Sequence, residues 1–200
     1  MNKLIVVYHS GFGHTKLQAE AVARGAESVD GMDAELMTTK EATDRLDTLD
    51  DADAIIFGSP TYMGNIAAEM KAFLEAAVVK WYPQLWKNKI AGAFTNSSSF
   101  SGDKLNTLIG LFINAMQQGM IFVGTAMLPG ANDREGFSNV EGPGPHAHNR
   151  VGSFVGPMAA SFEMDPPDAP PKGDLETAEA YGRRVAEITM QFVRGRRGPA

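Results

Sequence analysis

The sequence contains no cysteine among its 200 residues. This absence excludes disulfide bonds, thiolate metal sites, dithiol redox chemistry and cysteine nucleophiles. It also excludes the cysteine-dependent low-molecular-weight tyrosine phosphatases, which need that residue in their phosphate loop. Any redox chemistry would therefore have to be carried by a bound cofactor.

Positive charge is also scarce, with 18 Lys and Arg against 24 Asp and Glu and a net charge of −6. We therefore expect no binding to nucleic acid or to an anionic membrane surface. The arginines of the tail 194–200 are interpreted as a solvated chain end. No apolar run approaches membrane-spanning length and no signal peptide is evident, so a cytoplasmic protein is expected.

A length of 200 residues with 44% apolar side chains fits one domain, spanning residues 1–200. The unusual part is Leu128–Gly173, which is rich in Pro, Gly and Asn and shows no sustained periodicity. Long segments of this kind are generally functional or disordered. Because the segment carries aromatic residues such as Phe137, Phe154 and Phe162, we expect an ordered excursion over an active face or a subunit interface.

Apolar runs alternate with stretches of helical periodicity along the chain. The predicted strands are Leu4–Tyr8, Asp33–Thr38, Asp53–Pro60, Lys89–Asn96 and Met120–Val123. The first predicted helix begins at Lys16. The others cover Glu41–Leu49, Ile66–Val79, Asp103–Gln118 and Asp174–Phe192. This alternation predicts a parallel sheet joined by right-handed crossovers.

The loop Ser10–Thr15 lies between the first strand and the first helix. Its glycines allow close backbone approach to a ligand, and its position offers unpaired N–H groups at a helix N-terminus, an arrangement that binds phosphate. No Gly-Lys pair occurs in the chain, which excludes a P-loop, and Lys16 occupies the place of the third glycine of a dinucleotide fingerprint. Two interpretations remain, a hydroxyl-rich loop for the monophosphate of FMN and an ordinary strand-to-helix turn.

Two more core strands end in polar loops, Ser59–Asn65 and Asn96–Gly102. Ligands of open parallel sheets bind outside the carboxyl ends of the strands. The three loops are therefore expected side by side, one holding a phosphate and two flanking a planar ring.

Three motifs make the sequence recognisable: Tyr-x-Ser-x-x-Gly-His-Thr at Tyr8–Thr15, Ser-Pro-Thr-x-x-Gly-Asn at Ser59–Asn65 and Met-Lys-x-Phe-Leu at Met70–Leu74. With them, the chain resembles the flavodoxin-like NAD(P)H:quinone oxidoreductases of the WrbA type. The resemblance implies a doubly wound α/β fold with a five-stranded parallel sheet of order 2-1-3-4-5 and helices on both faces. It also implies FMN as cofactor, NADH or NADPH as electron donor, a quinone-like acceptor and a homodimer or homotetramer.

The same resemblance assigns residues to the site. The phosphate would be held by Ser10, Gly11, Phe12, Gly13, His14 and Thr15. The isoalloxazine ring would pack on Pro60, Thr61, Tyr62, Met63, Gly64 and Asn65, and its pyrimidine end would lie against Asn96, Ser97, Ser98, Ser99, Phe100 and Gly102. Trp81, with Tyr62, would line the pocket for quinone or nicotinamide. No protein residue is expected to be catalytic, and no metal site is expected at His146 and His148, for which no third ligand is evident.

The activity expected from the resemblance is a two-electron transfer from NAD(P)H to quinones by a ping-pong mechanism. One alternative is a flavodoxin, which carries single electrons and does not oxidise NAD(P)H directly. Another is an NAD(P)H-dependent reductase of free flavin, nitroaromatics or azo dyes. A third is a non-catalytic interaction protein that has kept the fold.

Overall fold

The computed structural model of the protein describes residues 1–130 and 144–197. Its strands are β1 (Asn2–Tyr8), β2 (Met32–Thr38), β3 (Ala54–Tyr62), β4 (Asn65–Ile66), β5 (Ile90–Ser97), β6 (Ile121–Phe122) and β7 (Met158–Ala160). Its helices are α1 (His14–Glu27), α2 (Thr39–Asp44), the 3₁₀ helix η1 (Leu46–Asp51), α3 (Ala68–Ala76), α4 (Val78–Trp81), α5 (Lys104–Gln117) and α7 (Lys172–Arg197). Phe137 lies outside the described residues. It was one of the aromatic residues from which an ordered excursion was expected.

The sheet has the order β2-β1-β3-β5-β6, and all neighbouring strands along this path are parallel. Counted along the chain, these are the second, first, third, fourth and fifth strands of the parallel array, so the predicted order 2-1-3-4-5 is confirmed. Two short strands, β4 and β7, bring the sheet to seven strands. They pair with β3 and β5 and leave the fold class unchanged.

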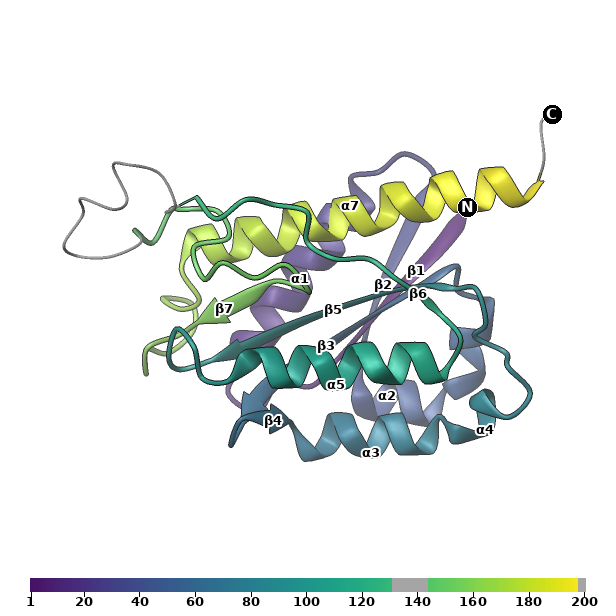
Figure 1. Cartoon of the computed structure of the whole chain (residues 1–200), viewed down its shortest axis with the longest axis horizontal. Helices are drawn as coiled ribbons and strands as arrows, with labels where there is room; N and C mark the ends of the chain where they lie inside the picture. Colours follow the sequence, from purple (N-terminus) through teal and green to yellow (C-terminus); the bar gives the residue numbers. More distant parts are fainter. Residues whose placement is uncertain (131–143, 198–200) are drawn as a thin grey trace.

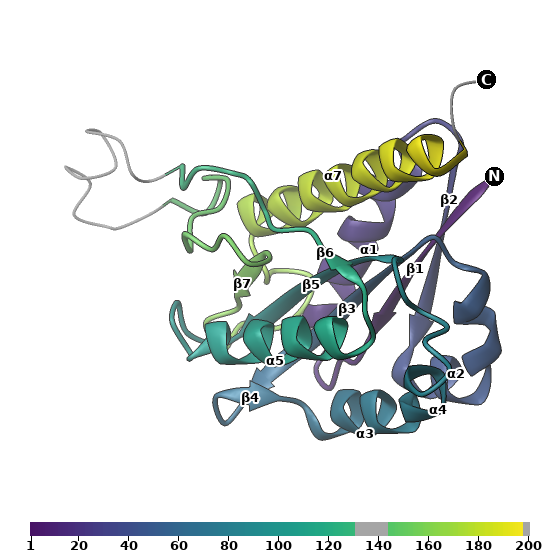
Figure 2. The ribbon, with the colours of Figure 1, turned by 45° about the vertical axis from the view of Figure 1, so that its right-hand side comes forward.

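Helices cover both faces of the sheet. Helices α1 and α7 lie together on one face, and α3 and α5 lie on the other (Figures 1 and 2). In β1, Leu4 and Val6 point into the first of these cores, whereas Ile5 and Val7 point into the second. This two-sided burial explains why the strand is a continuous apolar run rather than an alternating one.

Several helices have other limits than their periodicity predicts. The first begins at His14, because Gly13 adopts a φ of 93° and turns the chain directly into the helix. The second is divided into α2 and η1 at Arg45, whose φ of −124° and ψ of 41° are not helical, and the third is divided into α3 and α4 at Ala77. The last helix, α7, extends further at both ends than Asp174–Phe192. Over residues 1–130 and 144–197, none of the helices has the length and apolar character that crossing a bilayer requires.

The excursion divides the fifth position of the sheet between two segments. Strand β6 pairs with the start of β5 at Ile90 and Ala91, and β7 pairs with its end at Thr95–Ser97. Residues 158–160 are therefore a strand inside the excursion Leu128–Gly173, where the sequence showed no sustained periodicity. The pairing supplies partners for backbone groups at the end of β5 that would otherwise be unpaired. It also returns the chain to the carboxyl edge of the sheet.

Candidate functional site

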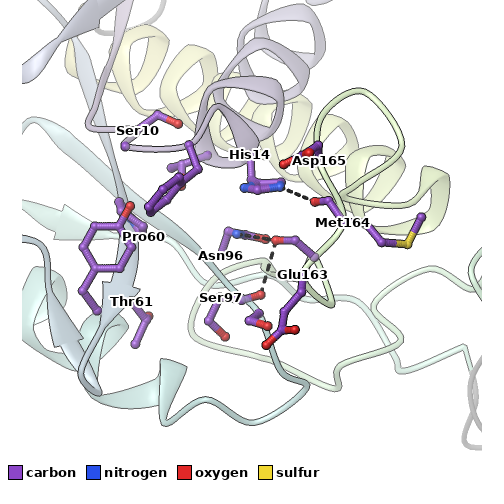
Figure 3. Close-up of a pocket in the computed structure, with 15 residues that line it drawn as sticks. Ser10, His14, Pro60, Thr61, Asn96, Ser97, Glu163, Met164 and Asp165 are labelled. Carbon is purple, nitrogen blue, oxygen red and sulfur yellow. Dashed lines mark hydrogen bonds between the residues drawn. The ribbon is translucent and has the colours of Figure 1, made fainter.

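A pocket of about 400 Å³ lies at the carboxyl edge of β1, β3 and β5 (Figure 3). All three loops that follow these strands contribute to it, and so does the excursion where it leaves β7. Its lining residues are Ser10, Gly11, Phe12, His14, Thr15, Pro60, Thr61, Tyr62, Asn96, Ser97, Ser98, Ser161, Glu163, Met164 and Asp165. The structure thus brings the three predicted loops together around one cavity.

The loop after β1 presents hydrogen-bond donors to this pocket. The Oγ atom of Ser10 accepts hydrogen bonds from the backbone N–H groups of Gly13 (3.1 Å) and Lys16 (3.2 Å). Because its lone pairs are engaged in this way, its hydroxyl proton remains available to a ligand. Thr15 lies in the first turn of α1 with only 1% of its surface exposed. The positive end of the helix dipole is therefore directed at the same place.

His14 joins this loop to the excursion. Its Nε2 atom lies 2.7 Å from the carbonyl oxygen of Met164, and Figure 3 shows the two groups meeting across the mouth of the pocket. The sequence predicted His14 as a donor to a ligand phosphate. The structure shows one of its ring nitrogens engaged with the excursion, which leaves Nδ1 as the nitrogen that could face a ligand.

The second loop is a hairpin rather than an irregular loop. Strand β3 continues to Tyr62, two residues beyond the predicted strand end, and turns back into β4. Met63 and Gly64 form the turn with φ values of 48° and 71°, the left-handed conformation that two-residue hairpins require. Met63, Gly64 and Asn65 consequently do not line the pocket, whereas Tyr62 does.

Tyr62 closes the wall between the first two loops. Its ring meets the ring of Phe12 edge to face, with centroids 6.3 Å apart. A Cβ atom on Gly11 would lie 2.4 Å from the Tyr62 hydroxyl oxygen, so a larger residue at Gly11 would displace this ring. Burial raises the pKa of the Tyr62 hydroxyl, although a hydrogen bond from the Gly11 backbone opposes the shift.

A chain of buried hydroxyl groups lies under this wall. The Oγ1 atom of Thr61 is 2.8 Å from that of Thr95 and 2.7 Å from that of Thr107. These contacts connect β3, β5 and α5 beneath the pocket. Since each hydroxyl has a partner, the network holds Thr61 in place without leaving a buried polar group unsatisfied.

The third loop is fixed by the excursion. The Asn96 side-chain amide and the Ser161 hydroxyl are hydrogen-bonded at 2.7 and 3.0 Å. Asn96, Ser97 and Ser98 line the pocket, but Ser99, Phe100 and Gly102 do not. The ring of Phe100 instead packs edge to face on that of Phe162, with centroids 4.8 Å apart.

Charged side chains are buried behind this third loop. Lys104, at the start of α5, has no exposed surface and donates to the Ser97 hydroxyl (2.8 Å) and to the Ser99 carbonyl. Burial lowers the pKa of its ammonium to about 8, even though Asp174 acts to raise it. Arg150 and Asp174 form a bidentate ion pair at 2.7 and 2.9 Å. Asp174 also accepts from the backbone N–H of Ala160, so this pair anchors β7.

Trp81 lies at the opposite end of the sheet from the pocket. It ends α4, which Figure 1 shows at the other end of the sheet from β4 and β7. Its neighbour Lys80 pairs with Asp50, which precedes β3. Within one chain the prediction that Trp81 lines the pocket is therefore wrong. Gly13 is also absent from the lining, although its N–H orients Ser10.

The sequence-based assignment missed the four residues that the excursion contributes, Ser161, Glu163, Met164 and Asp165. The available signal was the group of aromatic residues in the excursion, which indicated that it covers a functional face. That signal does not identify the individual residues, because the part of the excursion that reaches the pocket is set by the pairing of β7 with β5.

The two histidines near residue 147 show no metal-like arrangement. The Nε2 atom of His148 lies 3.1 Å from a carboxylate oxygen of Glu176 on α7. In the part of the chain that the structure describes, no three His, Asp or Glu side chains converge as metal ligands would.

Comparison with known proteins places this geometry in a family. Residues 28–133 match the model of the NADPH-dependent FMN reductase family. The chain is 38% identical to flavodoxin FldP of Pseudomonas aeruginosa (strain UCBPP-PA14), over 96% of this chain and 99% of the relative. It is 31% identical to an NAD(P)H dehydrogenase (quinone) of Syntrophobacter fumaroxidans, with the same coverage.

Among solved structures, the chain is similar to the flavodoxin, WrbA-like protein from Agrobacterium tumefaciens. The two are 38% identical, with a TM-score of 0.69 over 96% of this chain and 99% of that one. The strand order, the three strand-end loops and these similarities agree with one another. The chain belongs to the NADPH-dependent FMN reductase family of flavodoxin-like proteins.

Proposed function

We propose that the protein is an FMN-dependent oxidoreductase that takes two electrons from NADH or NADPH and delivers them to a quinone. FMN and a nicotinamide donor follow from membership of the family. The observation that carries the proposal is that the three strand-end loops line one common pocket at the carboxyl edge of the sheet. Because one pocket would receive donor and acceptor in turn, a ping-pong mechanism is expected.

The residues present fit FMN. The cavity volume of about 400 Å³ lies within the ordinary range for small-molecule and cofactor sites, roughly 300–1,000 Å³. At one end, the Ser10 hydroxyl and the first turn of α1 form a donor set suited to a monophosphate. At the other end, Asn96 and Ser97 supply amide and hydroxyl groups suited to the polar edge of a flavin ring.

The chemistry that FMN supplies when bound is acceptance of a hydride and delivery of two electrons to an acceptor. The protein's own groups would bind and orient. Tyr62 and Pro60 would flank the ring, and the hydrogen-bonded threonines beneath Thr61 would keep this wall rigid. Asn96 and Ser97 would stabilise charge that develops on the ring, as preorganised donors do elsewhere. No protein acid or base is assigned to the reaction.

The direct test is to purify the protein with FMN and follow the oxidation of NADH and NADPH with and without benzoquinone. We expect quinone-dependent oxidation with parallel lines in double-reciprocal plots, the pattern of a ping-pong mechanism. Absence of quinone-dependent oxidation with either nucleotide would overturn the assignment. Intersecting lines would retain the activity and overturn the ping-pong mechanism.

A flavodoxin-type electron carrier is the second candidate, because the relative named flavodoxin FldP is 38% identical over nearly the whole chain. A carrier predicts a stable one-electron-reduced flavin during reductive titration and no direct reduction by NAD(P)H. Anaerobic titration with NADPH, followed by absorbance, separates the two candidates. Full bleaching without a one-electron species favours the enzyme. Assays with free FMN, nitrobenzene derivatives and azo dyes then test the other acceptors.

We also propose that the protein forms a homodimer or homotetramer. The exposed face of α5 carries Leu105, Ile109, Ile113 and Met116 at helical spacing and no exposed charge. Apolar faces without charge are typical of interfaces between identical subunits. Light scattering after size exclusion should give a mass that is a multiple of the chain mass, and Ile109→Asp should reduce it. A monomer at micromolar concentration would contradict this proposal.

A further inference from the structure

Behind the pocket wall lies a buried positive charge whose hydrogen-bonding partners are neutral. Lys104 has no exposed surface, and the groups that accept from its ammonium are the Ser97 hydroxyl and the Ser99 carbonyl. Among the residues that the structure describes, no carboxylate forms an ion pair with it. A buried charge of this kind is unfavourable, so its position requires an explanation.

The charged groups around Lys104 do not balance it. Arg150, from the excursion, and Asp174, from α7, face it, but these two side chains are 3% and 1% exposed and neutralise each other. The Arg150 guanidinium also lies 5.0 Å from the centre of the Phe100 ring and 5.3 Å from that of Phe162. With Lys104 charged, the cluster therefore carries one net positive charge behind loop 96–102.

This charge lies one residue away from the pocket. Ser97 lines the pocket (Figure 3), and its Oγ atom is 2.8 Å from the Lys104 Nζ atom. The ammonium thus acts on the site through Ser97 and does not itself line it. Transfer of a hydride, with its electron pair, from a nicotinamide to a neutral isoalloxazine leaves a positively charged nicotinamide and adds one negative charge to the ring.

We propose that Lys104 is a positioning residue whose buried charge, conveyed through Ser97 and loop 96–102, makes the site prefer reduced FMN over oxidised FMN. The inference rests on the proposed function, because it requires FMN in this pocket. The preference is expected to be roughly tenfold, the order of effect that one unit charge has on a nearby group at an effective dielectric constant of about 20. For a two-electron couple, tenfold corresponds to about 30 mV in midpoint potential.

The protonation of Lys104 makes the preference depend on pH. The charge is present below about pH 8 and is lost as pH rises above it, since burial lowers the pKa of this ammonium. The charged groups that face it, Arg150 and Asp174, form an ion pair with each other. In the wild-type protein the midpoint potential relative to free FMN should therefore fall between pH 7 and pH 9.5.

The test compares midpoint potentials of bound FMN, by equilibration with dyes, in the wild type, Lys104→Met and Lys104→Arg. We expect Lys104→Met to lower the potential by about 30 mV at pH 7, a tenfold change, and to abolish the pH dependence relative to free FMN. Lys104→Arg keeps the charge and should stay within twofold of the wild type. Dissociation constants for oxidised FMN, measured for each variant, show whether loop 96–102 still contributes to FMN binding.

Two results would overturn the inference. One is a Lys104→Met protein whose dissociation constants for oxidised and reduced FMN rise by the same factor, since a purely structural role of Lys104 predicts that outcome. The other is a wild-type potential that follows free FMN from pH 7 to pH 9.5, a measurement that needs no variant to fold. Failure of the wild type to bind FMN would instead overturn the proposed function itself.

Discussion

The Nε2 atom of His14 lies 2.7 Å from the backbone carbonyl oxygen of Met164, and this contact ties the first turn of α1 to the excursion. The two residues are 150 positions apart in the sequence. Their contact places Glu163, Met164 and Asp165 at the mouth of a pocket otherwise built from strand-end loops. Access to the pocket thus depends on a segment outside the alternating strands and helices described above.

Replacing His14 by alanine should loosen this closure. Loss of one hydrogen bond, worth roughly 0.5–1.5 kcal/mol, predicts a dissociation constant for FMN about 2- to 12-fold higher. Hydrogen exchange at residues 161–165 should rise in parallel. Fluorescence quenching of FMN and exchange mass spectrometry give the two measurements. His148→Ala, which removes an exposed ring bound to Glu176, is the control. Equal exchange in both variants would show that the His14 contact does not hold the excursion.

Asp165→Asn should strengthen FMN binding. The Asp165 carboxylate lines the same pocket as the donors of loop 10–15 and would repel a phosphate dianion bound there. At a partly exposed site, removal of one like charge is expected to lower the dissociation constant by a few-fold, with a larger effect at low salt. Riboflavin, which has no phosphate, should not respond.

Asp168→Asn is the matched control for this prediction, since Asp168 is exposed and lies outside the pocket. The same gain in affinity for FMN and for riboflavin would mean that Asp165 acts on the ring end of the site, or on the fold, instead of on the phosphate.

Thr15→Asp should weaken FMN binding strongly, by about tenfold or more, because it places a carboxylate at a buried position beside the expected phosphate. Thr15→Asn has nearly the same shape without the charge and isolates the electrostatic part. Isothermal titration with FMN measures the difference between the two variants. Equal affinities of the Asp and Asn variants would place the phosphate elsewhere.

Lys104 should also leave a signature in stability. Burial lowers its pKa in the folded protein to about 8, from the ordinary lysine value of 10.5 that applies to the unfolded chain. Between these values the unfolded chain binds a proton that the folded protein has released, so stability rises with pH across this window. The gain is at most about 3 kcal/mol. Lys104→Met lacks this term and should exceed the wild type most clearly below pH 8.

Urea unfolding of the FMN-free protein at pH 7, 8, 9 and 10 tests this directly. The free energy difference between Lys104→Met and the wild type should shrink as pH rises from 8 to 10. Lys16→Met, which removes an exposed lysine, corrects for general effects of charge. A difference that stays constant with pH would show that Lys104 titrates normally.

Much of the fold follows from local sequence. The apolar runs at β1, β3 and β5 are buried on both faces. Continuous apolar runs of this kind are typical of central strands in a parallel sheet. Their order follows from the resemblance, and the position of the three following loops at one edge follows from parallel pairing. The boundaries were less predictable, because Gly13 starts α1 early and the Met63-Gly64 turn extends β3 into a hairpin.

The site was only partly predictable for a related reason. Ser10, Thr15, Tyr62 and Asn96 adjoin strand ends in the sequence, so strand pairing alone brings them together. Trp81 adjoins no strand end on that edge, and α4 takes it to the opposite end of the sheet. The position of a residue shortly after a recognised motif in the sequence therefore does not predict that the residue lies at the site.

The sequence by itself determined the parallel α/β plan, the absence of thiol chemistry and the three loops around one pocket, since these depend on local periodicity and composition. Only the tertiary structure decided which residues of the excursion reach that pocket and which charge lies behind it. The pairing of β7 with the end of β5 brings in Ser161–Asp165, and the packing of α5 and α7 buries Lys104 beside Asp174. These contacts join residues far apart in the chain, where no local pattern specifies a partner.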